Sequence, residues 1–278
     1  MNVAVLPNLD KRGSADMVEK IGAFFKSEGI TAYLPDNICC PNYNSLPEDE
    51  LFKIADCLVT IGGDGTIIRY AKRAALDGKP IVGINAGRVG YLANIEQSEY
   101  RLLGKLKTRE FTIERRMMLN ISVVENGRCV GSYYALNDAV IASGYVARII
   151  DVTASVDGDS INYFADGVIV STPTGSTAYS MAAGGPIIDP TTECMCLTPI
   201  CSHSLRAKPL VFSPDAQLEI TSKGKNDTRL YLTVDGNENY PLSKGDSVRI
   251  ARSEISTKLI RIKKDSFFSV LNQKMSEY

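Results

Sequence analysis

The hydrophobic pattern of this chain changes character near Phe111, and this change limits the possible folds more than any other feature. Before that point, short apolar runs alternate with amphipathic stretches, which predicts strands alternating with helices. This alternation is typical of an open parallel sheet with helices packed on it. After that point, β-branched runs follow one another between turn pairs, which is typical of layered antiparallel sheets. The sequence therefore predicts an α/β open-sheet domain followed by a β-sandwich domain.

One strand shows the character of the first region most clearly. Cys57–Ile61 is apolar throughout, as expected of a parallel strand that is covered on both faces. A helix is predicted to follow over Ile67–Leu76, and the aromatic tail Phe267–Leu271 predicts a second helix that packs back on this region. We expect an α/β nucleotide-binding domain made of residues 1–112, joined by the C-terminal segment 262–278.

Turn pairs divide the second region into short strands. Asn126-Gly127 separates two alternating runs and predicts a β-hairpin. Asp157-Gly158 and Asp235-Gly236 predict further tight turns. Lys258 to Lys264 alternates basic with apolar residues, which predicts a strand with one solvated face. We expect residues 113–261 to form the β-sandwich domain.

Composition excludes several classes of function. The 278 residues carry a formal net charge of −1, so the molecule has no overall electrostatic attraction to nucleic acid or to an acidic membrane. The seven cysteines form no CxxC pair and His203 is the single histidine, which argues against a regular zinc site. The N-terminus lacks a basic signal region, and no apolar run approaches the roughly 20 residues that span a bilayer. We expect a cytoplasmic protein with reduced thiols and without a metal site made only of protein ligands.

The sharpest local motif is the glycine-rich run Gly62–Thr66, which lies between a buried strand and a helix. Glycines permit positive φ and leave room for backbone N–H groups to approach a phosphate, and the following helix adds its positive end. Gly62, Gly63 and Thr66 are therefore candidate phosphate-loop residues. Asp64 could hold Mg²⁺ or accept a proton from an attacking hydroxyl. The alternative is a tight turn in which Asp64 caps the helix.

Other phosphate-binding and hydrolytic motifs are absent. The chain contains no GxxxxGK[ST] loop, no HRD or DFG signature and no GxSxG elbow. Gly83–Gly90 has glycines at spacings that differ from GxGxxG. This run is either a second glycine-rich loop at the same cleft or a simple turn. A hydrolase that used Ser176 or Ser180 would have His203 as its only histidine base, which disfavours that function.

The second motif is a loop dense in hydroxyl groups. Asp166–Ser180 runs from a buried strand into Ser, Thr and Tyr residues and then into Gly184-Gly185-Pro186. Hydroxyls and free amides suit the recognition of ribose and phosphate, and Tyr179 can stack or hydrogen-bond. The alternative is an ordinary capped helix start. Asn137-Asp138 interrupts an apolar stretch, which by itself predicts a bulge or turn.

Taken together, these segments resemble the NAD kinase family. The resemblance runs from Ile61 to about Leu242 and keeps the motifs in the same order. The segments that carry it are Gly62–Thr66, Asn85–Leu92, Leu136–Ile141, Asp166–Pro186 and Leu197–Leu210. The glycine motif is shared with lipid kinases, whereas the run up to Pro186 is more specific.

This resemblance implies an enzyme that phosphorylates the 2′-hydroxyl of the adenosine ribose of NAD with ATP, giving NADP and ADP. It implies Mg²⁺ with the ATP, NAD bound by the β-sandwich domain, and a homodimer or homotetramer. Asp64 would be the catalytic residue, acting on the hydroxyl as proton acceptor or through the metal. The substrate-binding positions that it implies are Gly65, Arg69, Asn137, Asp138, Arg148, Asp166, Thr177, Ala178, Tyr179, Ser180 and Asn237.

Two positions depart from the family pattern. The family usually has Glu where Asp138 stands, and it commonly has a basic residue where Phe164 stands. The direct ribose contact would then become water-mediated, and phosphate binding would either lose a partner or gain one from a neighbouring subunit. The alternatives are a lipid kinase of the diacylglycerol or sphingosine kinase type and a non-catalytic NADP-binding regulator.

Overall fold

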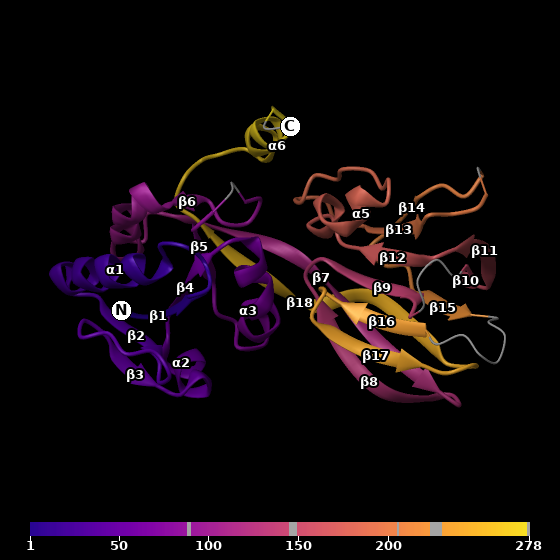
Figure 1. The fold of residues 1–278 in the computed structure, drawn as a ribbon, viewed down its shortest axis with the longest axis horizontal. Coiled ribbons are helices and arrows are strands. Elements are labelled where there is room, and N and C mark those ends of the chain that lie inside the picture. The colour runs from indigo at the N-terminus through magenta and orange to yellow at the C-terminus, as the bar shows by residue number, and fades with distance from the viewer. Residues whose placement is uncertain (88–89, 145–148, 205, 223–229, 277–278) are drawn as a thin grey trace. The chain divides into compact units, whose positions relative to one another are not determined.

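The structure is a computed structural model that describes the chain except for residues 88–89, 145–148, 205, 223–229 and 277–278 (Figure 1). The chain divides into two compact units. Unit 1 consists of Met1–Arg115 with Thr257–Tyr278, and unit 2 consists of Arg116–Ser256. No helix among the described residues is long and apolar enough to cross a bilayer.

Unit 1 is an α/β layer structure around a parallel sheet. Its elements are β1 (Asn2–Pro7), α1 (Ser14–Glu28), β2 (Thr31–Pro35), β3 (Asn44–Leu46), α2 (Glu48–Ile54), β4 (Cys57–Gly62), α3 (Asp64–Leu76), β5 (Ile81–Asn85), β6 (Ile95–Glu96), η1 (Gln97–Gly104), α4 (Lys105–Thr108) and α6 (Phe267–Ser276). The strands lie in the order β5, β4, β1, β2, β3, and each pairs in parallel with the next. Strands β4 and β5 are buried along their whole length, as the apolar Cys57–Ile61 run predicts.

The register of β4 and β5 brings two loops to one edge of this sheet. Gly62, the last residue of β4, pairs with Asn85, the last residue of β5. The Ala86 N–H donates to the Gly62 carbonyl at 2.6 Å, which ties the two strand ends together. Ligands of open α/β sheets bind beyond the carboxyl ends of the strands. The glycine motif and the loop after β5 therefore leave the sheet where a ligand is expected.

Unit 2 is built from two antiparallel sheets, and its first and last strands extend into unit 1 at residues 112–115 and 257–261. Its elements are β7 (Thr112–Glu125), β8 (Arg128–Ala135), β9 (Asp138–Ser143), β10 (Ile150–Val156), β11 (Asp159–Ala165), β12 (Gly167–Ser171), η2 (Gly175–Thr177), α5 (Tyr179–Ala182), β13 (Met195–Ile200), β14 (Leu210–Phe212), β15 (Leu218–Ser222), β16 (Leu230–Val234), β17 (Glu238–Leu242) and β18 (Ser247–Arg261). One sheet has the order β14, β13, β12, β9, β16, β17. The other contains β11, β10, β15 and β18, with β7 between β18 and β8.

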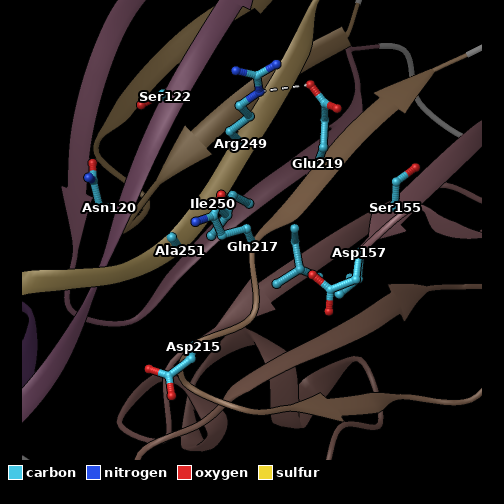
Figure 2. Close-up of a pocket in the computed structure, with 13 residues that line it drawn as sticks. Asn120, Ser122, Ser155, Asp157, Asp215, Gln217, Glu219, Arg249, Ile250 and Ala251 are labelled. Carbon is cyan, nitrogen blue, oxygen red and sulfur yellow. Dashed lines mark hydrogen bonds and ion pairs between the residues drawn. The ribbon is translucent and has the colours of Figure 1, made fainter.

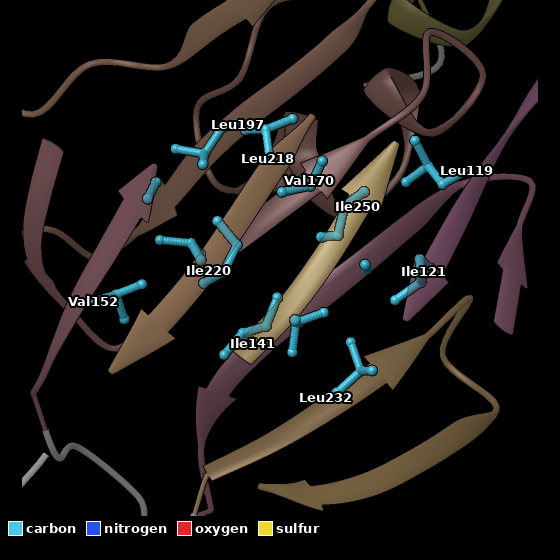
Figure 3. Close-up of a cluster of buried hydrophobic side chains, with 14 of the residues drawn as sticks. Leu119, Ile121, Ile141, Val152, Val170, Leu197, Leu218, Ile220, Leu232 and Ile250 are labelled. Carbon is cyan, nitrogen blue, oxygen red and sulfur yellow. The ribbon is translucent and has the colours of Figure 1, made fainter. Parts of the chain in front are cut away.

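Apolar side chains from both sheets fill the space between them (Figure 3). Ile121 of β7 and Ile220 of β15 come from one sheet, and Ile141 of β9 and Leu232 of β16 come from the other. All four are almost fully buried, so alternate residues of each strand supply the core of a sandwich. The predicted α/β plus β-sandwich class is confirmed.

Three turn predictions are confirmed by backbone geometry. Asn126 and Gly127 adopt φ values of 49° and 77° between β7 and β8, which pair as the expected hairpin. Asp157-Gly158 and Asp235-Gly236 show the same pair of positive φ values. Two consecutive positive φ angles match the twist of the flanking strands, which is why Asn-Gly and Asp-Gly are favoured there.

The prediction for Lys258 to Lys264 is confirmed in part. Strand β18 runs to Arg261, its Leu259 and Ile260 are buried, and Leu259 pairs in parallel with Ile81 of β5. The predicted solvated face is wrong at Arg261. A strand inside a parallel sheet is covered on both faces. Arg261 is accordingly only 15% exposed and takes part in hydrogen bonds. The expected C-terminal helix, by contrast, is confirmed as α6.

Candidate functional site

The glycine motif forms the junction between β4 and α3. Gly62 has no space for a side chain, because a Cβ there would lie 2.1 Å from the Thr66 hydroxyl oxygen. At Gly63 and Gly65 a Cβ would meet nothing within 4 Å, so these positions leave the backbone open to an approaching group. None of the three is among the glycines with positive φ in the described chain. Gly62 therefore allows close packing against Thr66, and Gly63 and Gly65 leave the backbone accessible to a ligand. The positive φ expected of these glycines is wrong.

Asp64 is held by the backbone of the loop that follows β5. Its Oδ2 accepts the Tyr91 N–H at 2.7 Å, and its Oδ1 accepts the N–H groups of Leu92 at 3.0 Å and Ala93 at 3.2 Å. The alternative in which Asp64 caps α3 is wrong, because the N-cap residue is Gly63 and no side chain caps this helix. Gly90 also lies against this carboxylate, where a Cβ would be 2.2 Å from Oδ1. Gly90 of the run Gly83–Gly90 therefore lies at the same edge as the glycine motif, which favours a second glycine-rich loop there, while residues 88–89 lie outside the described chain.

Arg69 lies on α3, one turn beyond Asp64, and its side chain is exposed. Its guanidinium carbon is 5.4 Å from the centroid of the Tyr70 ring, and Tyr70 is itself buried against Phe52. The contact gives the arginine a preferred direction on the helix surface. It leaves the guanidinium donors open to an anionic group.

In unit 2, Asn137 and Asp138 are positioned by Asp235. One carboxylate oxygen of Asp235 accepts the Leu136 N–H at 2.8 Å, and the other accepts the N–H groups of Asn137 at 2.7 Å and Asp138 at 3.0 Å. Asp138 begins strand β9 and is 5% exposed. The segment is therefore a fixed junction between β8 and β9, clamped by the turn that follows β16.

Two carboxyl groups at this junction have perturbed acidity. Burial, reinforced by the negative charge of Asp235, raises the pKa of Asp138 from 3.8 to about 7. Burial also raises the pKa of Asp235, and the three backbone N–H groups oppose that rise. Asp138 is thus partly protonated near neutral pH and can then donate as well as accept a hydrogen bond.

The hydroxyl-rich loop uses most of its hydroxyls internally. Thr172 donates to the Leu136 carbonyl at 2.5 Å, and Ser176 donates to the Pro173 carbonyl at 2.7 Å. Ser180 is fully buried and bonds to Thr198 at 2.9 Å. These three hydroxyls therefore help to build the loop, and their part in ligand recognition stays a prediction.

The part of this loop that faces solvent is short. Thr177 and Ala178 are half-buried, and Tyr179 is 46% exposed. Gly175 lets the loop pass close to the β8–β9 junction, because a Cβ there would lie 2.1 Å from the Asn137 carbonyl oxygen. The structure thus brings Gly175, two residues before Thr177, next to Asn137 within unit 2.

The remaining sequence-predicted residues of unit 2 are spread out. Asp166 is half-buried between β11 and β12, and its backbone N–H donates to the Ile200 carbonyl at 2.9 Å. Asn237 lies in the β16–β17 turn and donates from Nδ2 to the Asp235 carbonyl at 2.9 Å. Phe164 of β11 is 55% exposed. Arg148 lies outside the described residues.

A separate cavity of about 720 Å³ lies on the sandwich, over β10, β15 and β18 (Figure 2). Its lining includes Ser155, Asp157 and Gln217, together with Arg249 and Glu219, which form an ion pair at 3.0 Å. Its lining contains none of the sequence-predicted site residues. The charges of Arg249 and Glu219 neutralise each other in this ion pair. We therefore do not assign this cavity to the candidate site.

Two residues that position the site were not found from the sequence. Asp235 was assigned only to a turn, because nothing in the sequence links it to backbone groups about a hundred positions earlier. Arg261 was assigned to a solvated strand face, although it contacts the loop that holds Asp64. Both act on backbone groups that are distant in sequence, and such contacts leave no local pattern.

An open α/β sheet with glycine-rich segments at its edge, followed by an antiparallel sandwich, is typical of a two-domain nucleotide-binding protein. Residues 42–108 match the ATP-NAD kinase N-terminal domain, and residues 136–262 match the ATP-NAD kinase C-terminal domain. The NAD kinase of Caldanaerobacter subterraneus is 38% identical over 282 residues, covering 99% of each chain. This chain belongs to the ATP-NAD kinase family.

Solved structures share the fold. An NAD kinase from Archaeoglobus fulgidus in complex with ATP matches with a TM-score of 0.78 at 28% identity, covering 100% of both chains. A yeast NADH kinase complexed with NADH matches with a TM-score of 0.88, covering 99% of this chain and 87% of that one. The latter is 22% identical, so it supports the fold alone.

Gly90→Ala is expected to lower the melting temperature and to displace the Asp64 carboxylate, because the new methyl group would overlap Oδ1. Differential scanning fluorimetry measures the first effect. Gly87→Ala is the matched control for stability, since a Cβ at Gly87 meets nothing within 4 Å. Equal melting temperatures for the two variants would contradict the packing described for Gly90.

Asp138→Asn is expected to change how stability depends on pH. Because folding raises the pKa of Asp138 from 3.8 to about 7, the native state binds the extra proton between these values, and the free energy of unfolding falls as pH rises through that range. The asparagine variant lacks this loss. Urea unfolding at pH 5 and pH 8 should therefore show the variant gaining stability relative to wild type at pH 8. Asp157→Asn, in an exposed turn, should follow wild type at both pH values.

Proposed function

We propose that this chain transfers the terminal phosphoryl group of ATP to the 2′-hydroxyl of the adenosine ribose of NAD, forming NADP and ADP. The observation that carries the proposal is Asp64, a half-buried carboxylate fixed by three backbone N–H groups between two open glycines. Phosphoryl transfer demands mainly positioning and charge stabilisation. A rigidly held carboxylate beside open backbone amides meets both demands.

Asp64 keeps the capacity to act on a hydroxyl group. An ionised carboxylate offers about four acceptor positions, and the N–H groups of Tyr91, Leu92 and Ala93 occupy three of them. The fourth can accept the ribose hydroxyl proton as the oxygen attacks phosphorus. The open backbone at Gly63 and Gly65, with the start of α3, would face the phosphates.

Unit 2 would bind the dinucleotide. Asn137 and Asp138 would contact the adenosine part, supported by the Asp235 clamp on their backbone. Asp166 would approach the nicotinamide end, and the segment made of half-buried Thr177 and Ala178 and exposed Tyr179 would contact the dinucleotide. Because the Ser180 hydroxyl is bonded to Thr198, Ser180 would act by shaping the loop. Arg69, Arg148 and Asn237 complete the proposed contacts.

Mg²⁺ is proposed to enter with the nucleotide. Among the residues that the structure describes, no three His, Cys, Asp or Glu side chains form a group that could hold a metal ion. Mg²⁺ commonly keeps several waters and binds through one or two carboxylates and substrate phosphates. Asp64 of the glycine motif would supply one such carboxylate. When bound, the ion would neutralise phosphate charge. NADP formation should then require Mg²⁺ together with ATP.

Asp64→Asn is expected to lower kcat for NADP formation by roughly 10²–10⁴-fold, because the amide cannot accept the proton, while NAD binding is mostly retained. A coupled assay for NADP and calorimetric titration with NAD measure the two effects. Asp77→Asn, at the other end of the same helix, is the matched control and should turn over like wild type. A near-native kcat for Asp64→Asn would remove this carboxylate from the mechanism.

The same assay separates the alternative functions. Wild-type protein is offered NAD, a diacylglycerol and a sphingoid lipid in turn, and ATP consumption is followed. Phosphorylation of a lipid alone would replace the proposal with a lipid kinase. Binding of NADP without any turnover would instead indicate the non-catalytic regulator, consistent with the departures at Asp138 and Phe164.

We also propose that the chain forms a homodimer or homotetramer in the cytoplasm. All seven cysteines are free thiols, which suits a reducing compartment. Strand β11 ends one sheet and β14 ends the other, and Ile161, Phe164 and Val211 on these strands are 42–56% exposed. Exposed apolar edge strands favour association. Light scattering should therefore give a mass of two or four chains, and Phe164→Glu should reduce it. A wild-type monomer at micromolar concentration would contradict the proposal.

A further inference from the structure

Arg261 joins the end of β18 to the loop that holds Asp64. Its Nε donates to Glu114 Oε2 at 2.6 Å, and the two side chains are 15% and 26% exposed. Its Nη1 donates to the Leu92 carbonyl at 3.0 Å, and its Nη2 lies 3.5 Å from the Tyr91 carbonyl. One guanidinium thus contacts a carboxylate and two consecutive backbone carbonyls.

These two carbonyls belong to the peptide groups that bind Asp64. The Tyr91 carbonyl shares its peptide group with the Leu92 N–H, and the Leu92 carbonyl shares its peptide group with the Ala93 N–H. Both N–H groups donate to Asp64 Oδ1, at 3.0 and 3.2 Å. Each peptide group therefore lies between a cation at its oxygen and an anion at its hydrogen.

This arrangement strengthens the hold on Asp64 in two ways. A peptide group polarised at its oxygen becomes a better donor at its nitrogen, because hydrogen bonds in a chain reinforce one another. The planar fork of an arginine also fixes two acceptors at once, which a lysine ammonium cannot do with the same geometry. The loop backbone is thus fixed in orientation as well as in place.

The side chain of Tyr91 is held by the same C-terminal segment. The Lys274 ammonium lies 4.1 Å from the centroid of the Tyr91 ring, and the Phe267 ring centroid lies 6.1 Å from it. Both residues belong to α6. The C-terminal segment of unit 1 therefore holds Tyr91 by its carbonyl, through Arg261, and by its ring, through α6.

We propose that Arg261 is a positioning residue for phosphoryl transfer, acting through the Tyr91–Ala93 backbone to fix the Asp64 carboxylate in its reactive position. Glu114 orients the guanidinium for this task. The inference rests on the proposed role of Asp64 as the group that acts on the hydroxyl. Arg261 contacts neither NAD nor ATP in the proposed site. Its replacement should therefore lower kcat and leave the affinity for NAD unchanged.

The test compares Arg261→Ala, Arg261→Lys and the control Arg249→Ala. Arg249 lies on the same strand and also pairs with a glutamate, but its side chain is 61% exposed. Arg261→Ala should lower kcat on the order of 10²-fold, the cost expected when a catalytic group is misplaced by about 1 Å, with KM for NAD little changed. Arg261→Lys should fall between it and wild type, and Arg249→Ala should match wild type.

Amide hydrogen exchange supplies a readout that does not depend on turnover. Exchange at Tyr91, Leu92 and Ala93 should accelerate roughly tenfold or more in Arg261→Ala. Unchanged kcat and unchanged exchange in a folded Arg261→Ala variant would overturn the inference. If that variant does not fold, Arg261→Lys decides, and wild-type kcat in it would overturn the inference. Absence of NADP formation by the wild-type protein would instead refute the proposed function.

Discussion

The candidate site depends on the hydrogen bonds between one carboxylate and three consecutive backbone amides. Asp64 lies in the first turn of α3, and three of its acceptor positions are occupied by N–H groups of the loop that follows the neighbouring strand β5. These bonds explain why the loop cannot carry a side chain at Gly90. They also explain why half-buried Arg261 matters to the loop, since it donates to the carbonyl side of the same peptide groups.

Unit 2 also contains a carboxylate that accepts three backbone N–H groups, and there it fixes a junction between two strands. Asp235 accepts the N–H groups of Leu136, Asn137 and Asp138 and so fixes the β8–β9 junction. The two carboxylates differ in their role at the site. In the proposed mechanism Asp64 uses its remaining acceptor position for chemistry, whereas Asp235 clamps the backbone and its charge helps to raise the pKa of Asp138. A carboxylate that binds several backbone amides is thus the common element of both halves.

Much of the fold could be predicted from local pattern. The buried run Cys57–Ile61 and the three Asn-Gly or Asp-Gly turns follow from side-chain chemistry and backbone preference alone. The role of the hydroxyl-rich loop could not be predicted in the same way. Ser176 and Ser180 have the composition of a ligand-binding loop, but their hydroxyls bond within the protein, because a buried hydroxyl must find a partner wherever the fold places it.

The sequence by itself determined the two-part architecture, the position of Asp64 between open glycines at a strand end, and the family to which the chain belongs. The periodicity of hydrophobic residues, the positions of glycines and the turn pairs are local properties, so they can be recognised in short stretches of sequence. The three-dimensional fold was needed to show that the Tyr91–Ala93 amides bind the Asp64 carboxylate, that Asp235 clamps Asn137, and that half-buried Arg261 contacts the loop. These contacts involve backbone groups that are far from their partners in sequence. Every residue except proline carries the same backbone N–H, so the sequence does not indicate which acceptor that group binds.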